Sequence, residues 1–132
     1  MTLIIDASVA VKWFLQETES AKARNLIGSD AFIAPDFILL ETHHAVWKSW
    51  RRDETTFAAV DAVVETLRGV FEHIEPSTSL LAAAARMSLT LGHAIYDCLY
   101  IALAQRENAT LITADEKQFT IARKARVEAE LL

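Results

Sequence analysis

The sequence predicts an α/β fold in which helices cover both faces of a short central parallel sheet. Three short apolar segments typical of strands, at 2–5, 31–35 and 110–113, alternate with longer segments in which apolar residues recur every three or four positions. Of the 132 residues, 52% are hydrophobic and only 3 are Gly and 2 are Pro, a composition that suits a helix-rich globular protein. We therefore expect one domain over residues 1–132, built as a helix-rich α/β/α sandwich.

The first half of the chain supplies two strands and three helical segments. The strand TLII at 2–5 ends in Asp6 and is followed by a turn and the helical segment VAVKWF. Residues 18–26 have a helical composition, and AFIAP at 31–35 is the second strand. From 36 to about 52 the pattern is helical, with an apolar stripe formed by Phe37, Leu40, Val46, Trp47 and Trp50.

The second half continues the alternation. Helix stops at Gly69 and Gly92 and a proline at the start of one helix mark the boundaries. The predicted elements are, in order, a helix over 54–69, a strand over 70–75, helices over 77–91 and from about 94 to 107, the strand TLIT at 110–113, a short helix over 116–123 and an edge strand over 127–132.

Charge and cysteine content limit the class of protein. The formal charge of −5 disfavours a protein whose whole surface clamps nucleic acid, although metal ions bound in a local acidic pocket would admit an anionic substrate. The single cysteine, Cys98, excludes an internal disulfide, and the start MTLIID lacks the features of a signal peptide. Because Asp97 interrupts the longest apolar run, we expect a cytoplasmic protein without a membrane role.

Four acidic residues are expected to meet at one edge of the sheet. Asp97 lies in the first turn of the otherwise apolar helix AIYDCLYIALA, where an ionised carboxylate needs a partner or a metal. Asp6 and Asp115 each follow a strand, and the carboxyl ends of parallel strands share one edge. Glu41 lies one turn into the helix after the second strand. Four distant segments would thus bring carboxylates together.

Such a cluster predicts metal-dependent phosphodiester hydrolysis. Carboxylates this close repel one another, so that without a cation at least one should have a raised pKa. Ligands that are all oxygen favour Mg²⁺ or Mn²⁺ over zinc, and the chain has no paired cysteines or histidines with the spacing of a zinc site. One or two such ions can hold a phosphodiester, activate water for in-line attack and stabilise the leaving oxygen.

Each acid taken singly also has a purely structural interpretation. Asp6 and Asp115 are positioned as turn formers or helix N-caps. Asp97 could be a helix N-terminal charge favoured by the dipole, and Glu41 a solvated or ion-paired helix residue. Only the conjunction of the four favours a metal site.

The segments LIIDASVAVKWF, YDCLYIALA and TLITADEKQF, with Glu41 in the helix after Pro35, resemble the four acidic motifs of PIN-domain ribonucleases, and in particular VapC toxins of toxin–antitoxin pairs. The motifs span nearly the whole chain in the family's order. The resemblance implies Mg²⁺- or Mn²⁺-dependent cleavage of RNA, a homodimer, and inhibition by a VapB antitoxin whose tail occupies the active-site groove, in a heterotetramer or larger assembly. It implies that the metal-binding catalytic acids are Asp6, Glu41, Asp97 and Asp115.

Three further positions follow from the resemblance. Ser8 and Thr113 match hydroxyls beside the first and last acids, where they would orient carboxylates or waters, although an N-cap or strand-end hydrogen bond explains them as well. His44 departs from the family pattern, which often has Asn three residues after the helix glutamate. We expect His44 at the rim of the pocket, with donation to a substrate phosphate as the alternative.

Basic residues that could contact phosphates are numerous, but most helical Lys and Arg only solubilise, so none is assigned individually. They are Lys12, Arg51, Arg52, Lys117, Arg123, Lys124 and Arg126. Trp50, beside two of them, could anchor a partner helix.

Three alternatives compete with a nuclease. A phospho-receiver domain wants an acidic pair after its first strand, whereas here only Asp6 follows that strand and the mid-chain acids lie in helices. A haloacid-dehalogenase-like phosphatase needs a second Asp at position 8, which is Ser8. A catalytically inactive PIN fold that serves as a binding module is disfavoured by the presence of all four acids.

Overall fold

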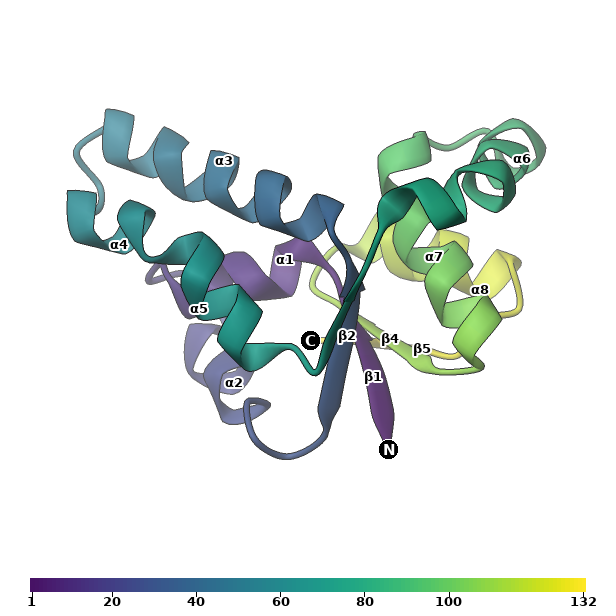
Figure 1. The fold of residues 1–132 in the computed structure, drawn as a ribbon, viewed down its shortest axis with the longest axis horizontal. Coiled ribbons are helices and arrows are strands. Elements are labelled where there is room, and N and C mark those ends of the chain that lie inside the picture. Colours follow the sequence, from purple (N-terminus) through teal and green to yellow (C-terminus); the bar gives the residue numbers. More distant parts are fainter.

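A five-stranded parallel sheet with the order β3-β2-β1-β4-β5 forms the centre of the computed structural model, which describes residues 1–132 (Figure 1). The central strands are buried on both faces, which explains why they are continuous apolar runs rather than alternating ones. The predicted α/β/α architecture is confirmed. The strands are β1 (Thr2–Ile5), β2 (Ala31–Pro35), β3 (His73–Glu75), β4 (Thr110–Thr113) and β5 (Ala129–Leu131).

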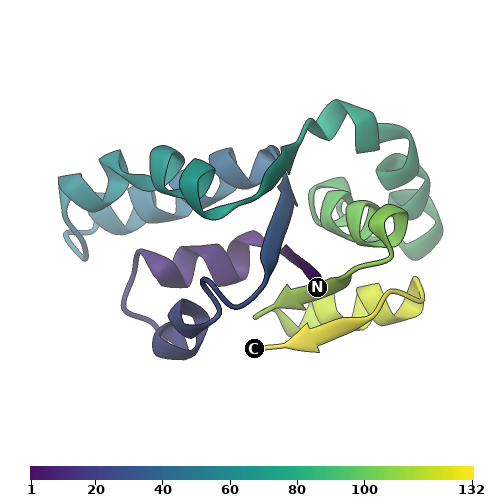
Figure 2. The ribbon, with the colours of Figure 1, turned by 60° about the horizontal axis from the view of Figure 1, so that its bottom comes forward.

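Helices divide into two groups because the chain reverses its direction across the sheet. From β1 through β2 to β3 the chain moves one way, and from β3 through β4 to β5 it moves the other way, so right-handed crossovers put the two sets of helices on opposite faces. Figure 2 shows α1–α5 on one side and α6–α8 on the other. The helices are α1 (Ala7–Ala10), α2 (Ser20–Asn25), α3 (Phe37–Arg51), α4 (Phe57–Asp61), α5 (Val63–Val70), α6 (Leu81–Leu91), α7 (Ile95–Glu107) and α8 (Glu116–Lys124), with 3-10 turns at Val11–Trp13 and Ser77–Leu80.

Helix α7 is the central helix of its face. Its residues from Cys98 to Ala104 are all buried, and it lies against β1, β2 and β4. Because α7 leads into β4, it runs antiparallel to the strands, and its first turn therefore lies at their carboxyl ends. No single helix has the length and composition to cross a bilayer; segments 77–91 and 95–107 meet that test only together, with a bend of 115° between them.

Two helical predictions require correction. The buried residues of α3 are Ile38, Thr42, Val46 and Ser49, whereas Leu40, Trp47 and Trp50 of the predicted stripe are exposed. The elements packed against α3 are α1, α4, α5 and the 3-10 turn Val11–Trp13, and the side that they cover leaves these three large apolar side chains exposed. The helix predicted over 54–69 is two helices, α4 and α5, which meet at Ala62, and Phe57 at its start is 67% exposed.

Candidate active site

The candidate site lies where the sheet reverses its direction. β1 and β4 are neighbours, with Ile5 opposite Ile112, yet the chain leaves β1 for α1 on one face and β4 for α8 on the other. Open α/β sheets bind ligands beyond the strand ends at such a switch point. Asp6 directly follows β1, and Asp115 lies two residues after the end of β4. Both acids that were predicted at strand ends therefore flank this crevice.

Asp6 is a buried carboxylate that caps a helix. It is 5% exposed, and its Oδ1 accepts the backbone N–H of Ser8 at 3.1 Å and the Ser8 hydroxyl. Burial raises the pKa of Asp6 to about 7, and the nearby charge of Glu41 adds to this, while hydrogen bonds from Ser8 and Thr113 lower it. Without a cation this carboxyl is therefore only half ionised near neutral pH.

The hydroxyls of Ser8 and Thr113 join the ends of β1 and β4. Their oxygens are 3.2 Å apart, the Ser8 Oγ accepts the N–H of Ala114 at 2.8 Å, and the Thr113 Oγ1 accepts the N–H of Asp115 at 3.1 Å. The strand-end hydrogen bonds of the structural interpretation are thus present. Ser8 also orients Asp6, so one network contains both of the roles considered for these hydroxyls.

Asp97 lies half-buried in the first turn of α7, beside a buried histidine. The Nε2 atom of His93 is 3.0 Å from the Asp97 Oδ2, although the contact lacks the alignment of a hydrogen bond. Burial raises the pKa of Asp97; His93 opposes this, and the charge of Asp115 adds to it. No arginine pairs with Asp97, and its carboxylate faces another acid.

Glu41 projects from α3 toward the same place. Its Oε1 accepts the hydroxyl of Tyr100 at 2.7 Å, and burial raises the pKa of Tyr100 well above its ordinary value, so the phenol stays protonated and donates. Burial also raises the pKa of Glu41, with a further contribution from Asp97, against the Tyr100 hydrogen bond. The hydrogen bond from Tyr100 to Glu41 thereby joins α7 to α3 near the acids that these helices carry, Asp97 and Glu41.

Gln118 connects the segments that carry Asp97 and Asp115. The side chain is 1% exposed, and its Nε2 donates to the backbone carbonyl of Asp97 at 2.9 Å. Its backbone N–H donates to the Oδ1 of Asp115 at 3.4 Å, while its own Oε1 is buried without a partner. One residue of α8 therefore fixes the first turn of α7 and the N-cap of α8 together.

Asp115 is exposed and caps α8. Its Oδ1 accepts the N–H of Lys117 at 2.8 Å, in agreement with the N-cap interpretation, and no protein group bonds its Oδ2. This oxygen is available to a ligand.

The structure brings the four acids together as a row of neighbours, since the charge of Glu41 affects Asp6, that of Asp97 affects Glu41, and that of Asp115 affects Asp97. No three carboxylate, imidazole or thiol groups lie close enough to enclose an ion. Mg²⁺ and Mn²⁺ need fewer protein ligands than zinc, because Mg²⁺ usually takes one or two carboxylates and keeps several waters whereas zinc takes three or four protein ligands. Neighbouring carboxylates without an enclosing third ligand would therefore suit such an ion better than zinc.

His44 is exposed and makes no hydrogen bond. Its ring stacks on Trp47, with 5.6 Å between the centroids, and the guanidinium of Arg51 lies 5.8 Å from the Trp47 ring. The residue therefore belongs to an aromatic and cationic row along the outside of α3, one turn beyond Glu41.

Sequence reasoning missed three residues of the site: His93, Tyr100 and Gln118. Tyr100 lies three positions after Asp97, which is the spacing of side chains that share a helix face, and His93 lies four positions before it, just ahead of the N-cap of α7. That spacing was a usable signal. Gln118 had none, because a glutamine in a short polar helix gives no indication of burial.

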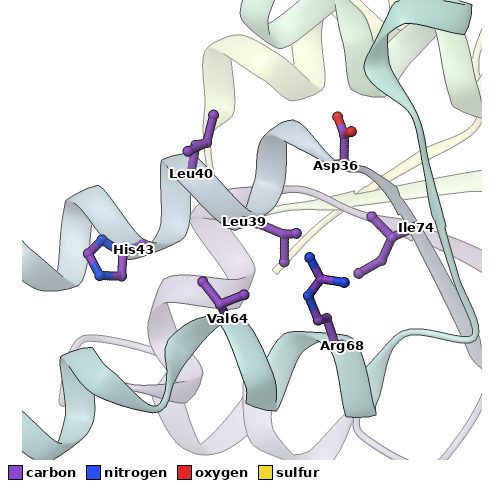
Figure 3. A pocket seen from close by; sticks show the side chains of 7 residues that line it. All are labelled: Asp36, Leu39, Leu40, His43, Val64, Arg68 and Ile74. Atoms are coloured by element: carbon purple, nitrogen blue, oxygen red, sulfur yellow. The ribbon is translucent and has the colours of Figure 1, made fainter.

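A hollow of about 700 Å³ lies between α3 and α5 (Figure 3). Leu39, Val64 and Ile74 form its apolar part, and Asp36, His43 and Arg68 are at its polar edges (Figure 3). His43 also lines a second hollow of about 280 Å³ formed with Trp47, Trp50 and Phe57. Together they make an apolar groove along the outside of α3, which we call the α3–α5 groove.

Comparison with known proteins identifies the family. The PIN domain matches residues 3–125. The chain is a PIN-domain protein. It is 32% identical over 116 residues to Ribonuclease VapC3 of Mycobacterium tuberculosis, covering 87% of this chain and 83% of that protein, and it belongs with the VapC proteins. Membership in the PIN family excludes the phospho-receiver and phosphatase alternatives.

Solved structures agree on the fold. The VapC20 toxin of M. tuberculosis, described as cleaving the sarcin–ricin loop, superposes with a TM-score of 0.70 at 18% identity, over 88% of this chain and 92% of that chain. VapBC2 of Rickettsia felis, solved with a promoter DNA fragment, gives 0.68 at 18% identity, over 100% and 99%. PIN-domain ribonucleases generally use a divalent metal.

Proposed function

We propose that this protein is an Mg²⁺- or Mn²⁺-dependent endoribonuclease and the toxin of a type II toxin–antitoxin pair. Residues 1–132 form its one PIN domain, and it acts in the cytoplasm, where its RNA substrate lies. One observation carries the proposal: at the switch point of the sheet, burial raises the pKa of Asp6, Glu41 and Asp97, and none of them forms an ion pair with a lysine or arginine. A carboxylate cluster kept in this state is suited to a divalent cation and a phosphodiester. The VapC relative supports the assignment of RNA as substrate.

Each residue of the site has a role that follows from its position. Asp6, Glu41, Asp97 and Asp115 would hold the metal, which when bound supplies Lewis-acid activation of water and charge neutralisation at the phosphate. Tyr100 holds Glu41 in place, and Ser8 and Thr113 orient Asp6 and the end of β4. Because the pKa of Asp6 is about 7 and those of Glu41 and Asp97 are raised, protons compete with a cation for these carboxyls, so binding should weaken as the pH falls.

The proposal includes a partner chain. VapBC2 is a toxin–antitoxin complex of the same fold, and the α3–α5 groove carries Leu40 at 69% and Phe57 at 67% exposure. We infer that an antitoxin lays the apolar face of a helix into this groove and its tail across the acids, on a homodimer of the toxin, in a heterotetramer or larger assembly.

Variant Phe57→Glu should lower the affinity for the antitoxin by about tenfold or more, because it puts a charge into the apolar contact. Leu89→Glu is the matched control, since Leu89 on α6 is 87% exposed and lies outside the groove. The measurement is a calorimetric titration of each variant with the antitoxin, taken as the protein that the adjoining reading frame encodes. Equal affinities of the two variants would remove the groove from the partner assignment.

The catalytic proposal is tested by metal binding and by RNA cleavage. Mg²⁺ or Mn²⁺ at a hundred times its Kd should stabilise the protein by about 2.7 kcal/mol in a thermal melt, because it binds only the folded pocket. Asp6→Asn should gain much less. RNA cleavage should require the metal and stop with EDTA. Metal binding without cleavage of any RNA would favour the inactive binding module.

A further inference from the structure

A basic hollow lies on the α6–α8 side of the molecule, away from the acidic edge. Its volume is about 430 Å³, and Arg86 of α6 and Lys124 and Arg126 at the end of α8 line it. Lys124 alone could be explained by the helix dipole, since it lies in the last turn of α8. Arg86 lies in the middle of α6 and Arg126 lies beyond the end of α8, so the dipole does not account for the group.

The three cations have no anionic partner within the protein. None of their side chains takes part in a salt bridge or hydrogen bond, and no acidic residue lines the hollow. Of the lysines and arginines, only Lys12, Arg52 and Arg106 form ion pairs in the structure, so what distinguishes these three cations is that they line one hollow together. Three unpaired cations in one concave site, on a chain with 18 acidic residues, leave positive charge that an anionic ligand would neutralise.

The remaining lining has the chemistry of a nucleotide site. Met87 and Leu91 give an apolar surface on which a base can lie. The amide of Gln105 can donate and accept hydrogen bonds, and the hydroxyl of Thr90, which donates to the backbone carbonyl of Arg86 at 2.9 Å, can accept one. Single-stranded RNA offers a phosphate, a flat base and hydrogen-bonding edges together. An acidic peptide offers carboxylates and backbone amides, but not a phosphate joined to a flat base.

We propose that the hollow between α6, α7 and α8 is a second RNA-binding site, which holds a phosphate on Arg86, Lys124 and Arg126 and a base against Met87 and Leu91. The proposal rests on the proposed ribonuclease function. The site would hold the part of the RNA chain that lies on one side of the bond that is cut.

The distance to the acids suits one RNA strand. Helix α8 runs from Asp115 at the acidic edge to Lys124, which at 1.5 Å per residue is about 13 Å, and α7 covers about 12 Å from Asp97 to Gln105. At about 3.4 Å per nucleotide of a stacked strand, about four nucleotides separate the two sites.

The experiment measures RNA binding of the full chain in EDTA, where the metal-dependent cleavage is stopped. A single-stranded oligoribonucleotide long enough to span both sites is titrated over a salt series with wild type and with Arg86→Glu/Lys124→Glu. The control, Lys22→Glu/Lys48→Glu, makes the same charge change on α2 and α3 at lysines that line no hollow and form no ion pair. Thermal melts establish that both variants are folded.

We expect the Arg86/Lys124 variant to lose at least about tenfold in affinity and its slope of log K against log salt to fall by about 0.7, because the site neutralises one phosphate of a single strand. The control should keep the slope of wild type. Equal changes in both variants would overturn the site, since the effect would then be one of net charge.

Two further outcomes separate the competing explanations. If a glutamate-rich peptide displaces the RNA as well as a matched unlabelled RNA does, the hollow takes an acidic protein segment and the RNA assignment is overturned. If the protein binds RNA through the hollow but cleaves none with Mg²⁺ or Mn²⁺, the ribonuclease function fails while the binding site stands.

Discussion

Carboxylates at the ends of two strands of the same sheet are in opposite electrostatic states. Glu75 ends β3, where His73 lies 2.7 Å away, Ser79 donates at 2.8 Å and Arg106 lies at 3.1 Å, and these contacts lower its pKa to about 2. Asp6 follows β1, has no cationic partner, and has a pKa of about 7. The two share an edge and a position relative to their strands, yet one is fully ionised at neutral pH and the other is not.

The difference teaches that a strand-end position does not by itself make a functional site. Glu75 is satisfied by its own protein and serves as a link between β3 and α7. Asp6 and its neighbours repel one another, and they contact hydroxyls and one histidine but form no ion pair with a lysine or arginine. The unsatisfied charge is what distinguishes the candidate site.

The sharpest test exchanges one carboxylate for an amide in each region. Asp97→Asn should lower the metal-dependent kcat by about a thousandfold, since several kcal/mol of transition-state stabilisation depend on the metal site. Glu75→Gln, the same chemical change at the same edge, should leave kcat unaltered. The measurement is cleavage of RNA under single turnover. Similar losses in both variants would mean that Glu75 also takes part in the reaction.

The two regions should also respond to pH with opposite signs. Asp6 has a folded pKa above its unfolded value, so its contribution to stability is full below about 4 and is lost as the pH rises to about 7, by at most about 4 kcal/mol without metal. Glu75 has a lowered pKa, so its contribution is present above about 4.5 and lost as the pH falls toward 2. Urea unfolding in EDTA across this range measures both.

Asp6→Asn serves as the control for the pH experiment. Asn keeps an oxygen for the Ser8 hydrogen bonds but cannot ionise, so the variant should be more stable than wild type above pH 7 and should show a flatter decline. A wild-type stability that rises between pH 4 and 7 would contradict the buried, unpaired state of Asp6.

A smaller effect is expected at Gln118. Gln118→Met keeps the buried volume but removes the donor to the Asp97 carbonyl, so the metal concentration for half-maximal cleavage should rise by about 10- to 100-fold, as for other residues that hold metal ligands in place. Gln118→Glu, which can donate only when protonated, should recover cleavage at lower pH. A loss of kcat without a change in the metal requirement would mean a merely structural role.

The smallest effect belongs to the ion pair of the satisfied region. Arg106 is 42% exposed at its side chain, so Arg106→Ala should lower the free energy of unfolding by at most about 1 kcal/mol. Cleavage of RNA should not change. Denaturant unfolding and the cleavage assay together check this, and a large loss of activity would connect Glu75 to the site after all.

Much of this could be predicted from the sequence, because local patterns determine local structure. The alternation of short apolar strands with helices predicts a parallel sheet, and a parallel sheet brings residues after β1 and β4 to one edge, so the positions of Asp6 and Asp115 followed from pattern alone. The position of Asp97 in the first turn of its helix could be predicted from the sequence in the same way. The stripe of α3 was wrong because periodicity shows that a helix has an apolar side, but not which side neighbouring elements cover.

Tertiary structure alone decided which charges were satisfied. The hydrogen bond from Tyr100 to Glu41 joins residues 59 positions apart, and the contact of Arg106 with Glu75 joins residues 31 positions apart. The sequence by itself determined which residue types stand at the strand ends, since that depends on neighbours along the chain. Whether a carboxylate there meets a cation, a phenol or another acid depends on packing across the sheet, and this packing gives Asp6 and Glu75 their opposite pKa shifts.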